Sequence, residues 1–239
     1  MAVEVVKDAQ FLIFMTQDAI PSCPDAFRLL LKAFGDSKVG MAYGRQLPRP
    51  QARAIERHAR LANYPDAGLE LRSLGDRKRY GIKTVFSSNS FAAYRRQALV
   101  AVGGFPDDAL FAEDQVVAGR MLMSGWNLAY VGGACVTHSH AYSVKQELQR
   151  YFDVGVFHAR NRWLLDSFGR AEGEGLRFVK SEMKYLLKHE PLSIPAALTR
   201  TFAKYLGYAL GRFERFWPAT LKSRISMSPS YWRPRRDPL

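Results

Sequence analysis

FLIFMTQD, residues 11–18, is the stretch of this 239-residue sequence on which the fold assignment depends. Its first five residues, Phe11–Met15, are all apolar, which is the pattern of a parallel strand buried on both faces of a sheet. The three residues that follow are polar and end in Asp18. Because open α/β sheets place their ligands at the carboxyl ends of such strands, we expect a binding site that includes Asp18.

Strands and helices alternate on both sides of this stretch, with Gly and Pro at their boundaries. Residues 69–83 are polar and basic, and we expect a mobile loop there. The alternation predicts an α/β fold over 1–141, followed by a basic helical extension over 142–239. The expected elements are the end of a helix at 2–9, helices within 24–34, 45–66, 95–102 and 113–124, strands at 11–15, 39–43, 84–94 and 126–136, and later helices at 143–166, 174–189 and 195–216.

The charge of the chain lies mostly in its second part. Lys and Arg number 35 against 22 Asp and Glu, a net charge of +13, of which residues 142–239 carry +9. Such a surface suits nucleic acid, anionic lipid or a phosphorylated substrate, and charge does not choose among them. No zinc, helix-turn-helix or RNP pattern accompanies it, so we expect no nucleic-acid partner.

The cysteine content and the length of the apolar segments indicate the cellular location of the protein, although less directly. The two cysteines, Cys23 and Cys135, are too few for a disulfide framework and lack a metal-binding spacing, so a reducing cytoplasm is expected. The apolar run Phe11–Met15 is far shorter than the roughly 20 residues of a spanning helix, and no signal peptide opens the chain. Any membrane contact is therefore expected to be peripheral, at the inner membrane face through the basic C-terminal helices.

Acidic and imidazole side chains stand at the ends of the expected elements. Asp18 is either a hard oxygen ligand for Mg²⁺ or Mn²⁺ or a turn former before Pro21. Glu113 and Asp114 open a helix, where one carboxylate serves as a cap and the other is free to act as a general base. His138 and His140 follow a strand; their spacing puts them on opposite faces if the strand continues, so at most one, His138, is expected to face a metal.

Other polar residues are candidates for substrate binding. Arg45, Gln46 and the Ser87–Ser90 cluster can hydrogen-bond sugar hydroxyls or phosphate oxygens, and Arg is the better anion ligand because its planar group binds in a bidentate way. Alternatively, these residues only help to form loops and turns.

Taken in order, these segments resemble the family 2 glycosyltransferases with the GT-A fold, and most closely the bacterial rhamnosyltransferase branch. Phe11–Ala19 resembles the strand that ends in the DxD-type metal motif, Phe111–Gln115 the ED motif, and Val136–His140 the final His motif. Further similar segments are Gly40–Pro48, Phe86–Ser90, Arg95–Arg96, Val102–Pro106 and Gly125–Val131.

The resemblance implies a partial GT-A (Rossmann-like) mixed sheet flanked by helices, and an inverting sugar transfer. By position, Asp18 would bind the divalent cation on a nucleotide-diphosphate sugar with support from His138, and Gln17 and Arg45 would lie beside that donor. Asp114 would be the general base, oriented by Glu113. The implied sugar is rhamnose, and the implied acceptor is a saccharide or is lipid-linked.

The sequence departs from the family pattern at two points. Gln17 stands where many relatives have a further acid, so metal affinity is expected to be modest. The family's opening nucleotide-binding strands, about 60–100 residues, are not found before Phe11, and Met1 therefore resembles an internal start, the start of a shortened gene model or a real truncation. A non-catalytic remnant that binds acceptor, membrane or a partner is the alternative that this leaves open.

Overall fold

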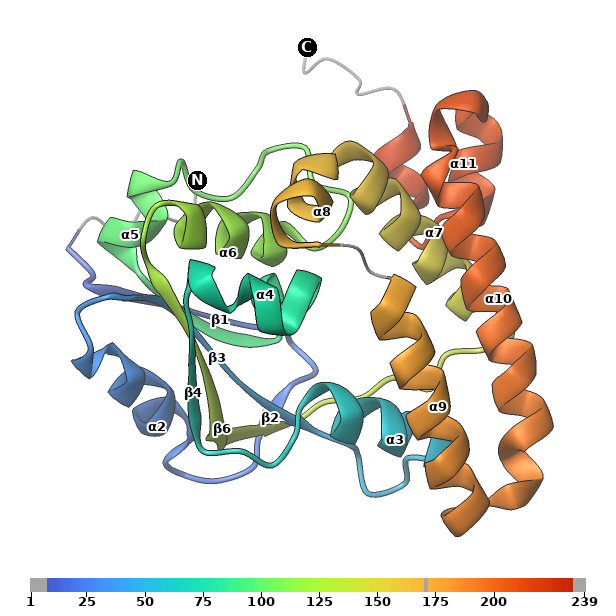
Figure 1. The fold of residues 1–239 in the computed structure, drawn as a ribbon, viewed down its shortest axis with the longest axis horizontal. Coiled ribbons are helices and arrows are strands. Elements are labelled where there is room, and N and C mark those ends of the chain that lie inside the picture. The colour runs from blue at the N-terminus through green and yellow to red at the C-terminus, as the bar shows by residue number, and fades with distance from the viewer. Residues whose placement is uncertain (1–7, 170–171, 234–239) are drawn as a thin grey trace.

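The structure, a computed structural model, describes residues 8–169 and 172–233. The helix expected at residues 2–9 falls almost wholly outside these residues. A six-stranded mixed sheet forms the centre, in the order β1-β5-β3-β6-β2, with β4 paired to β6. Helices flank the sheet, and a group of C-terminal helices lies beside it (Figure 1). The predicted α/β class, with a mixed sheet between helices, is confirmed.

The strand β1 (Phe11–Met15) forms where the sequence predicts it, but its environment differs from the prediction. Among the described strands it pairs only with β5 (Phe91–Arg95), and the pairing is antiparallel. Leu12 is buried, whereas Ile13 and Met15 are 39% and 42% exposed. The prediction of a doubly buried parallel strand is therefore wrong, because an unbroken apolar run does not reveal how many neighbours the strand has.

The two longest strands, β3 (Val39–Leu47) and β6 (Asn127–Thr137), pair in parallel at the centre of the sheet. Their register shifts after Gly44, at a point where a Cβ atom would lie 2.4 Å from the carbonyl oxygen of Ala134. Only glycine fits such an approach, which lets the two strands stay together past the irregularity. Both strands then end close together, and this sets the positions of Gln46 and His138.

Helices cover both faces of the sheet. On one face, α5 (Arg96–Ala101) and α6 (Glu113–Met123) pack Leu99, Met121 and Leu122 against Tyr43 and Tyr130 of the sheet. On the other face, α2 (Ala26–Lys32) and the 3-10 turn that follows it pack onto β3, β5 and β6. α3 (Ala54–Asn63) follows β3 and faces the C-terminal helices.

The segment 69–83 is structured, so the loop prediction is wrong. Leu69–Arg72 forms β4, antiparallel to β6, and the chain continues into α4 (Arg77–Tyr80) and a 3-10 helix, Gly81–Val85. Arg72 donates a hydrogen bond to the Lys83 carbonyl at 2.9 Å. Backbone pairing with β6 and side-chain contacts of this kind hold the segment in place. Neither leaves an apolar periodicity in the sequence, so the sequence pattern does not predict this structure.

The C-terminal helices are α7 (Val144–Arg160), α8 (Arg162–Phe168), α9 (Glu172–His189), α10 (Ile194–Arg212) and α11 (Ala219–Ile225). α7 and α10 cross at backbone distance: a Cβ atom at Gly207 would lie 2.2 Å from the Leu148 carbonyl oxygen, and one at Gly155 would lie 2.3 Å from that of Tyr208. Phe157 and Leu164 share the core of the sheet, so the division at residue 141 stays a prediction. Over the described residues, no helix has both the length and the apolarity needed to cross a bilayer.

Candidate active site

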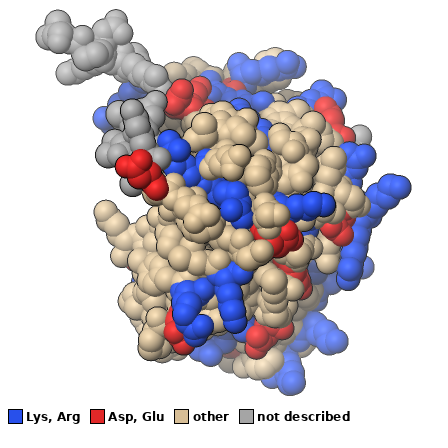
Figure 2. Space-filling model, turned by 90° about the vertical axis from the view of Figure 1, so that its left-hand side faces the viewer, with Lys and Arg blue, Asp and Glu red and all other residues tan. Residues whose placement is uncertain are grey.

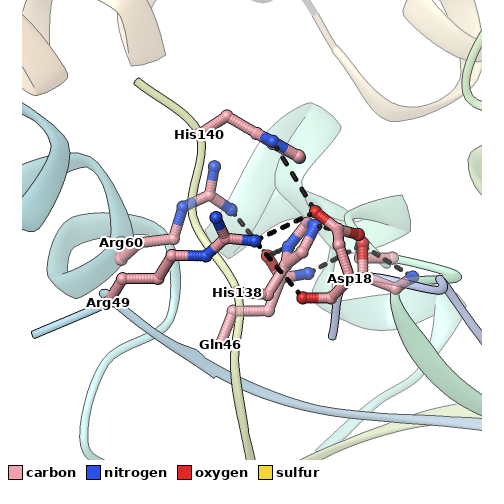
Figure 3. A network of polar contacts seen from close by, with 8 residues as sticks. Asp18, Gln46, Arg49, Arg60, His138 and His140 are labelled. Carbon is pink, nitrogen blue, oxygen red and sulfur yellow. Dashed lines mark hydrogen bonds and ion pairs between the residues drawn. The ribbon is translucent and has the colours of Figure 1, made fainter. Parts of the chain in front are cut away.

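Asp18 lies in the turn between β1 and β2 (Ile20–Pro21), and two histidines from the end of β6 face it (Figure 3). Its Oδ1 atom is 3.3 Å from Nε2 of His138, and its Oδ2 atom is 3.7 Å from Nδ1 of His140. One potential ligand atom from each of the three residues lies within 4.8 Å of the others. The arrangement is compatible with a single cation held by one carboxylate and two imidazoles.

The presence of both histidines differs from the expectation that at most one would face a metal. β6 ends at Thr137, so the alternation of a strand does not apply to the residues after it. The two rings lie 4.6 Å apart and nearly perpendicular, both directed to Asp18. Sequence spacing does not show where the strand stops, so it does not predict that His140 also faces Asp18.

The protonation of His138 follows from its neighbour Gln46. Arg60, which can only donate, gives a hydrogen bond to Oε1 of Gln46 at 2.6 Å, and this assigns that atom as the amide oxygen. Nδ1 of His138 lies 2.9 Å from the same oxygen and must therefore carry the proton. In the neutral ring, the lone pair then resides on Nε2 and points at the Asp18 carboxylate.

The electrostatics support a neutral ring and an ionised acid. Burial lowers the pKa of His138 to about 4, and burial likewise lowers the pKa of His140. Burial alone would raise the pKa of Asp18, but His138, the Thr16 side chain, His140 and a backbone hydrogen bond together lower it below its usual value. Near neutral pH, two lone-pair donors therefore face each other at 3.3 Å across the His138–Asp18 pair, which a cation would satisfy.

A second group of acids lies at the start of α6. The residue before this helix, Ala112, has a φ of +55°, in the left-handed region. Asp114 is buried and accepts hydrogen bonds from the backbone N–H of Asn89 at 3.0 Å and of Gln115 at 2.8 Å. Burial, and then the negative charge of Glu113, raise the pKa of Asp114 to about 7. A carboxyl group with that pKa can accept a proton near neutral pH.

Asn89 connects the two acids to each other and to the core. Its Nδ2 atom donates to Glu113 at 2.9 Å, and its Oδ1 atom accepts from the Tyr94 hydroxyl at 2.6 Å. Tyr94 is fully buried in the sheet, so the amide is held in a fixed orientation. The sequence placed Asn89 in a polar cluster but gave no sign of this role, because its partners come from β5 and α6.

The short segment Ser88–Ser90 lies between the two groups. Gln46, which orients His138, donates to Oγ of Ser88 at 2.8 Å, and Thr16 donates its N–H to the Ser90 carbonyl at 3.4 Å. The residue between the two serines binds Asp114 and Glu113, as above. The Asp18–His138–His140 cluster and the acidic pair are thus attached to the same three consecutive residues.

The donor-side roles expected for Arg45 and Gln17 stay predictions. Arg45 pairs with Asp66 at 2.6 Å, and Gln17 is exposed. The arginine beside Asp18 is instead Arg49, whose Nη2 atom is 3.5 Å from the carboxylate, and Arg60 joins the same network through Gln46 (Figure 3). Sequence reasoning missed both, since Arg49 follows the end of β3 and Arg60 lies on α3, where neither stands near a recognisable motif.

Comparison with known proteins gives matches over nearly the whole chain. The family described as "Glycosyl transferase family group 2" matches residues 13–222. The O-antigen chain rhamnosyltransferase WbaN of Salmonella anatum is 48% identical over 231 residues, which cover 97% of this chain and 73% of that protein. RfbN of Salmonella typhimurium, another O-antigen chain rhamnosyltransferase, is 47% identical over 232 residues, 97% of this chain and 74% of that protein.

Among solved structures, the mannosyltransferase PcManGT from Pyrobaculum calidifontis, in complex with GDP-Man and Mn²⁺, matches with a TM-score of 0.45 and 16% identity. The match covers 96% of this chain and 62% of that one. The family match and the identity to the two Salmonella proteins together confirm the resemblance drawn from the motifs. The chain belongs to the family 2 glycosyltransferases and is rhamnosyltransferase-like.

Proposed function

We propose that this chain carries the metal-binding and acceptor-activating residues of an inverting transferase that uses a nucleotide-diphosphate sugar. The observation that carries the proposal is the attachment of two chemically distinct groups, Asp18 with two histidines and Asp114 with Glu113, to the one segment Ser88–Ser90. A sugar transferase needs both groups at one centre, because the leaving diphosphate and the attacking hydroxyl meet at the same anomeric carbon.

The first group fits a divalent cation. Asp18, His138 and His140 would hold it, and the Nε2 lone pair opposite the Asp18 carboxylate gives it two donors already in position. When bound, Mn²⁺ or Mg²⁺ would neutralise negative charge on the donor diphosphate. Nitrogen ligands favour Mn²⁺ of the two. Arg49 and Arg60 lie where they could bind phosphate oxygens.

The second group fits proton removal from the acceptor. Asp114 would take the proton of an acceptor hydroxyl as that oxygen attacks the anomeric carbon and the bond to the diphosphate oxygen breaks. Glu113, held by Asn89, would orient the acceptor or the base. One such displacement inverts the anomeric configuration. From the two Salmonella relatives we infer rhamnose as the sugar, with a saccharide or lipid-linked acceptor.

The test is a transfer assay with nucleoside diphosphate rhamnose and oligosaccharide acceptors, after removal of metal with a chelator and readdition of Mn²⁺ or Mg²⁺. We expect metal-dependent transfer that Asp114→Asn reduces by about 10²–10⁴-fold. Asp107→Asn is the matched control, because Asp107 is an exposed acid in the segment before α6. Full activity of Asp114→Asn would refute the assignment, and acceptor binding without any transfer would favour the non-catalytic alternative.

A further inference from the structure

Helix α10 turns two cations inward and exposes large apolar side chains on its outward side. Its two mid-helix cations, Arg200 and Lys204, point inward, with 22% and 15% of their side chains exposed, and both pair with Glu147 of α7. Its outward side carries Leu198, Phe202 and Tyr205, which are 52%, 66% and 72% exposed. A surface helix normally buries its apolar side, so the exposed side of α10 needs an apolar partner.

Three exposed apolar residues lie along one side of α10, and two more follow at its C-terminal end. The spacing of Leu198, Phe202 and Tyr205 keeps them on one side of the helix, opposite the glycines that contact α7. Phe213 and Phe216, 59% and 64% exposed, follow where the helix ends. These five residues are called the α10 stripe. In Figure 1 the helix forms the outer edge of the molecule, with α7 and α9 on its inner side.

The exposed charges of the C-terminal segment that contains the α10 stripe are positive. From residue 173 to residue 233 none of the four acidic side chains is exposed, and two of them, Glu182 and Glu214, are buried. The exposed ionic side chains in this part are basic: Arg177, Lys180, Lys184, Lys188, Arg212, Arg215, Arg224 and Arg233. On the opposite side of the molecule, shown in Figure 2, acidic and basic side chains are both visible.

We propose that the α10 stripe docks on a lipid bilayer surface that contains anionic headgroups. Aromatic side chains with basic neighbours suit the boundary between acyl chains and headgroups, where the rings enter and the cations meet lipid phosphates. Since none of the helices in the described part of the chain can span a bilayer, the helix would lie along the surface. A second copy of the chain fits less well, because it would bring the same positive charge to the interface.

Docking would bring the candidate active site close to the membrane. Arg200 of α10 donates a hydrogen bond to the Tyr142 carbonyl, and the Tyr142 ring stacks on His140 with centroids 5.2 Å apart. The docked helix is therefore connected to the cluster around Asp18 through these two contacts. A lipid-linked acceptor would lie within the same surface layer, although the docking itself does not depend on the proposed transfer chemistry.

Vesicle flotation of the full chain tests the proposal, with phosphatidylcholine vesicles that contain or lack phosphatidylglycerol. We expect binding that needs phosphatidylglycerol and weakens with salt, and that Phe202→Gln with Tyr205→Gln reduces by about tenfold or more. The control is Val100→Gln with Met123→Gln, at residues 51% and 55% exposed on α5 and α6. Both double variants should keep the wild-type melting temperature and transfer to a soluble acceptor, so failure of docking and failure of the transferase assignment remain distinguishable.

A second variant keeps the test valid if the first does not fold. Arg212→Gln with Arg215→Gln should reduce binding to the vesicles that contain phosphatidylglycerol by about tenfold. Three results would overturn the proposal. They are a folded stripe variant that floats like wild type, a control variant that loses binding to the same extent, and binding that does not depend on headgroup charge. A dimer, measured by light scattering, that the stripe substitutions convert to a monomer would also overturn it.

Discussion

Replacing Asp114 by Asn should change the stability of the protein in a direction that depends on pH. The pKa of this carboxyl group rises from 3.8 to about 7 in the folded chain, so the folded state binds the proton more tightly than the unfolded state. Its contribution to stability is therefore complete below pH 3.8 and is lost as the pH rises to about 7, a loss of about 4 kcal/mol. The Asp114→Asn variant has no ionisable group there and escapes that loss.

The substitution also has a cost that does not vary with pH. Both carboxylate oxygens of Asp114 accept a backbone N–H, from Asn89 and Gln115, and an amide can offer only one oxygen. The lost bond costs about 1–3 kcal/mol. We therefore expect the variant to be less stable than wild type by about 1–3 kcal/mol near pH 4, and more stable by about 1–3 kcal/mol near pH 8.

Urea unfolding of both proteins across this pH range measures the difference directly. Asp107→Asn again serves as the control, and its effect should be small and independent of pH, because Asp107 is exposed. A stability difference for Asp114→Asn that stays constant between about pH 4 and pH 8 would refute the reasoning. In that case Asp114 would not be a buried group with a raised pKa, and its assignment as the base would lose its electrostatic support.

Three further outcomes are expected. Gln46→Ala removes the acceptor that fixes the His138 proton and should weaken Mn²⁺ binding about 10–100-fold in a calorimetric titration; unchanged affinity would argue against His138 as a ligand. Asn89→Ala should lower the free energy of unfolding by about 1–3 kcal/mol because the buried Tyr94 hydroxyl loses its acceptor, and adding Tyr94→Phe should recover part of that loss. Gly207→Ala should lower the free energy of unfolding by about 1–3 kcal/mol or more, because the new Cβ would meet the backbone of α7; the measurement is the melting temperature. An unchanged melting temperature would mean that the two helices can move apart without cost.

The elements that local pattern controls could be predicted from the sequence. The helix α6 begins and ends within a residue of its expected bounds, and α3 lies inside the expected range 45–66 and ends at the predicted Asn63–Pro65 boundary, because apolar spacing, Gly125 and that boundary are local signals. β4 could not be predicted, since its order comes from pairing with β6, more than fifty residues away along the chain.

The candidate site divides in the same way. Asp18, Asp114 and His138 stand at element ends, where polar residues after a buried run are visible in sequence. The roles of His140 and Arg60 depend on where β6 stops and on which side of α3 faces the cluster, and both are set by tertiary packing. Arg45 lies at a promising position in the chain, the structure pairs it with Asp66 after the register shift at Gly44, and its role toward the donor stays a prediction.

The close crossing of α7 and α10 has a consequence for how the outer helix behaves. Gly155, Gly207 and Gly211 bring the two backbones together without intervening side chains, so no rotamer change could accommodate a rotation of α10 about its axis. The orientation of the helix is therefore fixed by main-chain geometry. Any affinity of its outer side for a surface would be present at all times, and it could be adjusted by ionic strength or lipid composition but not by a turn of the helix.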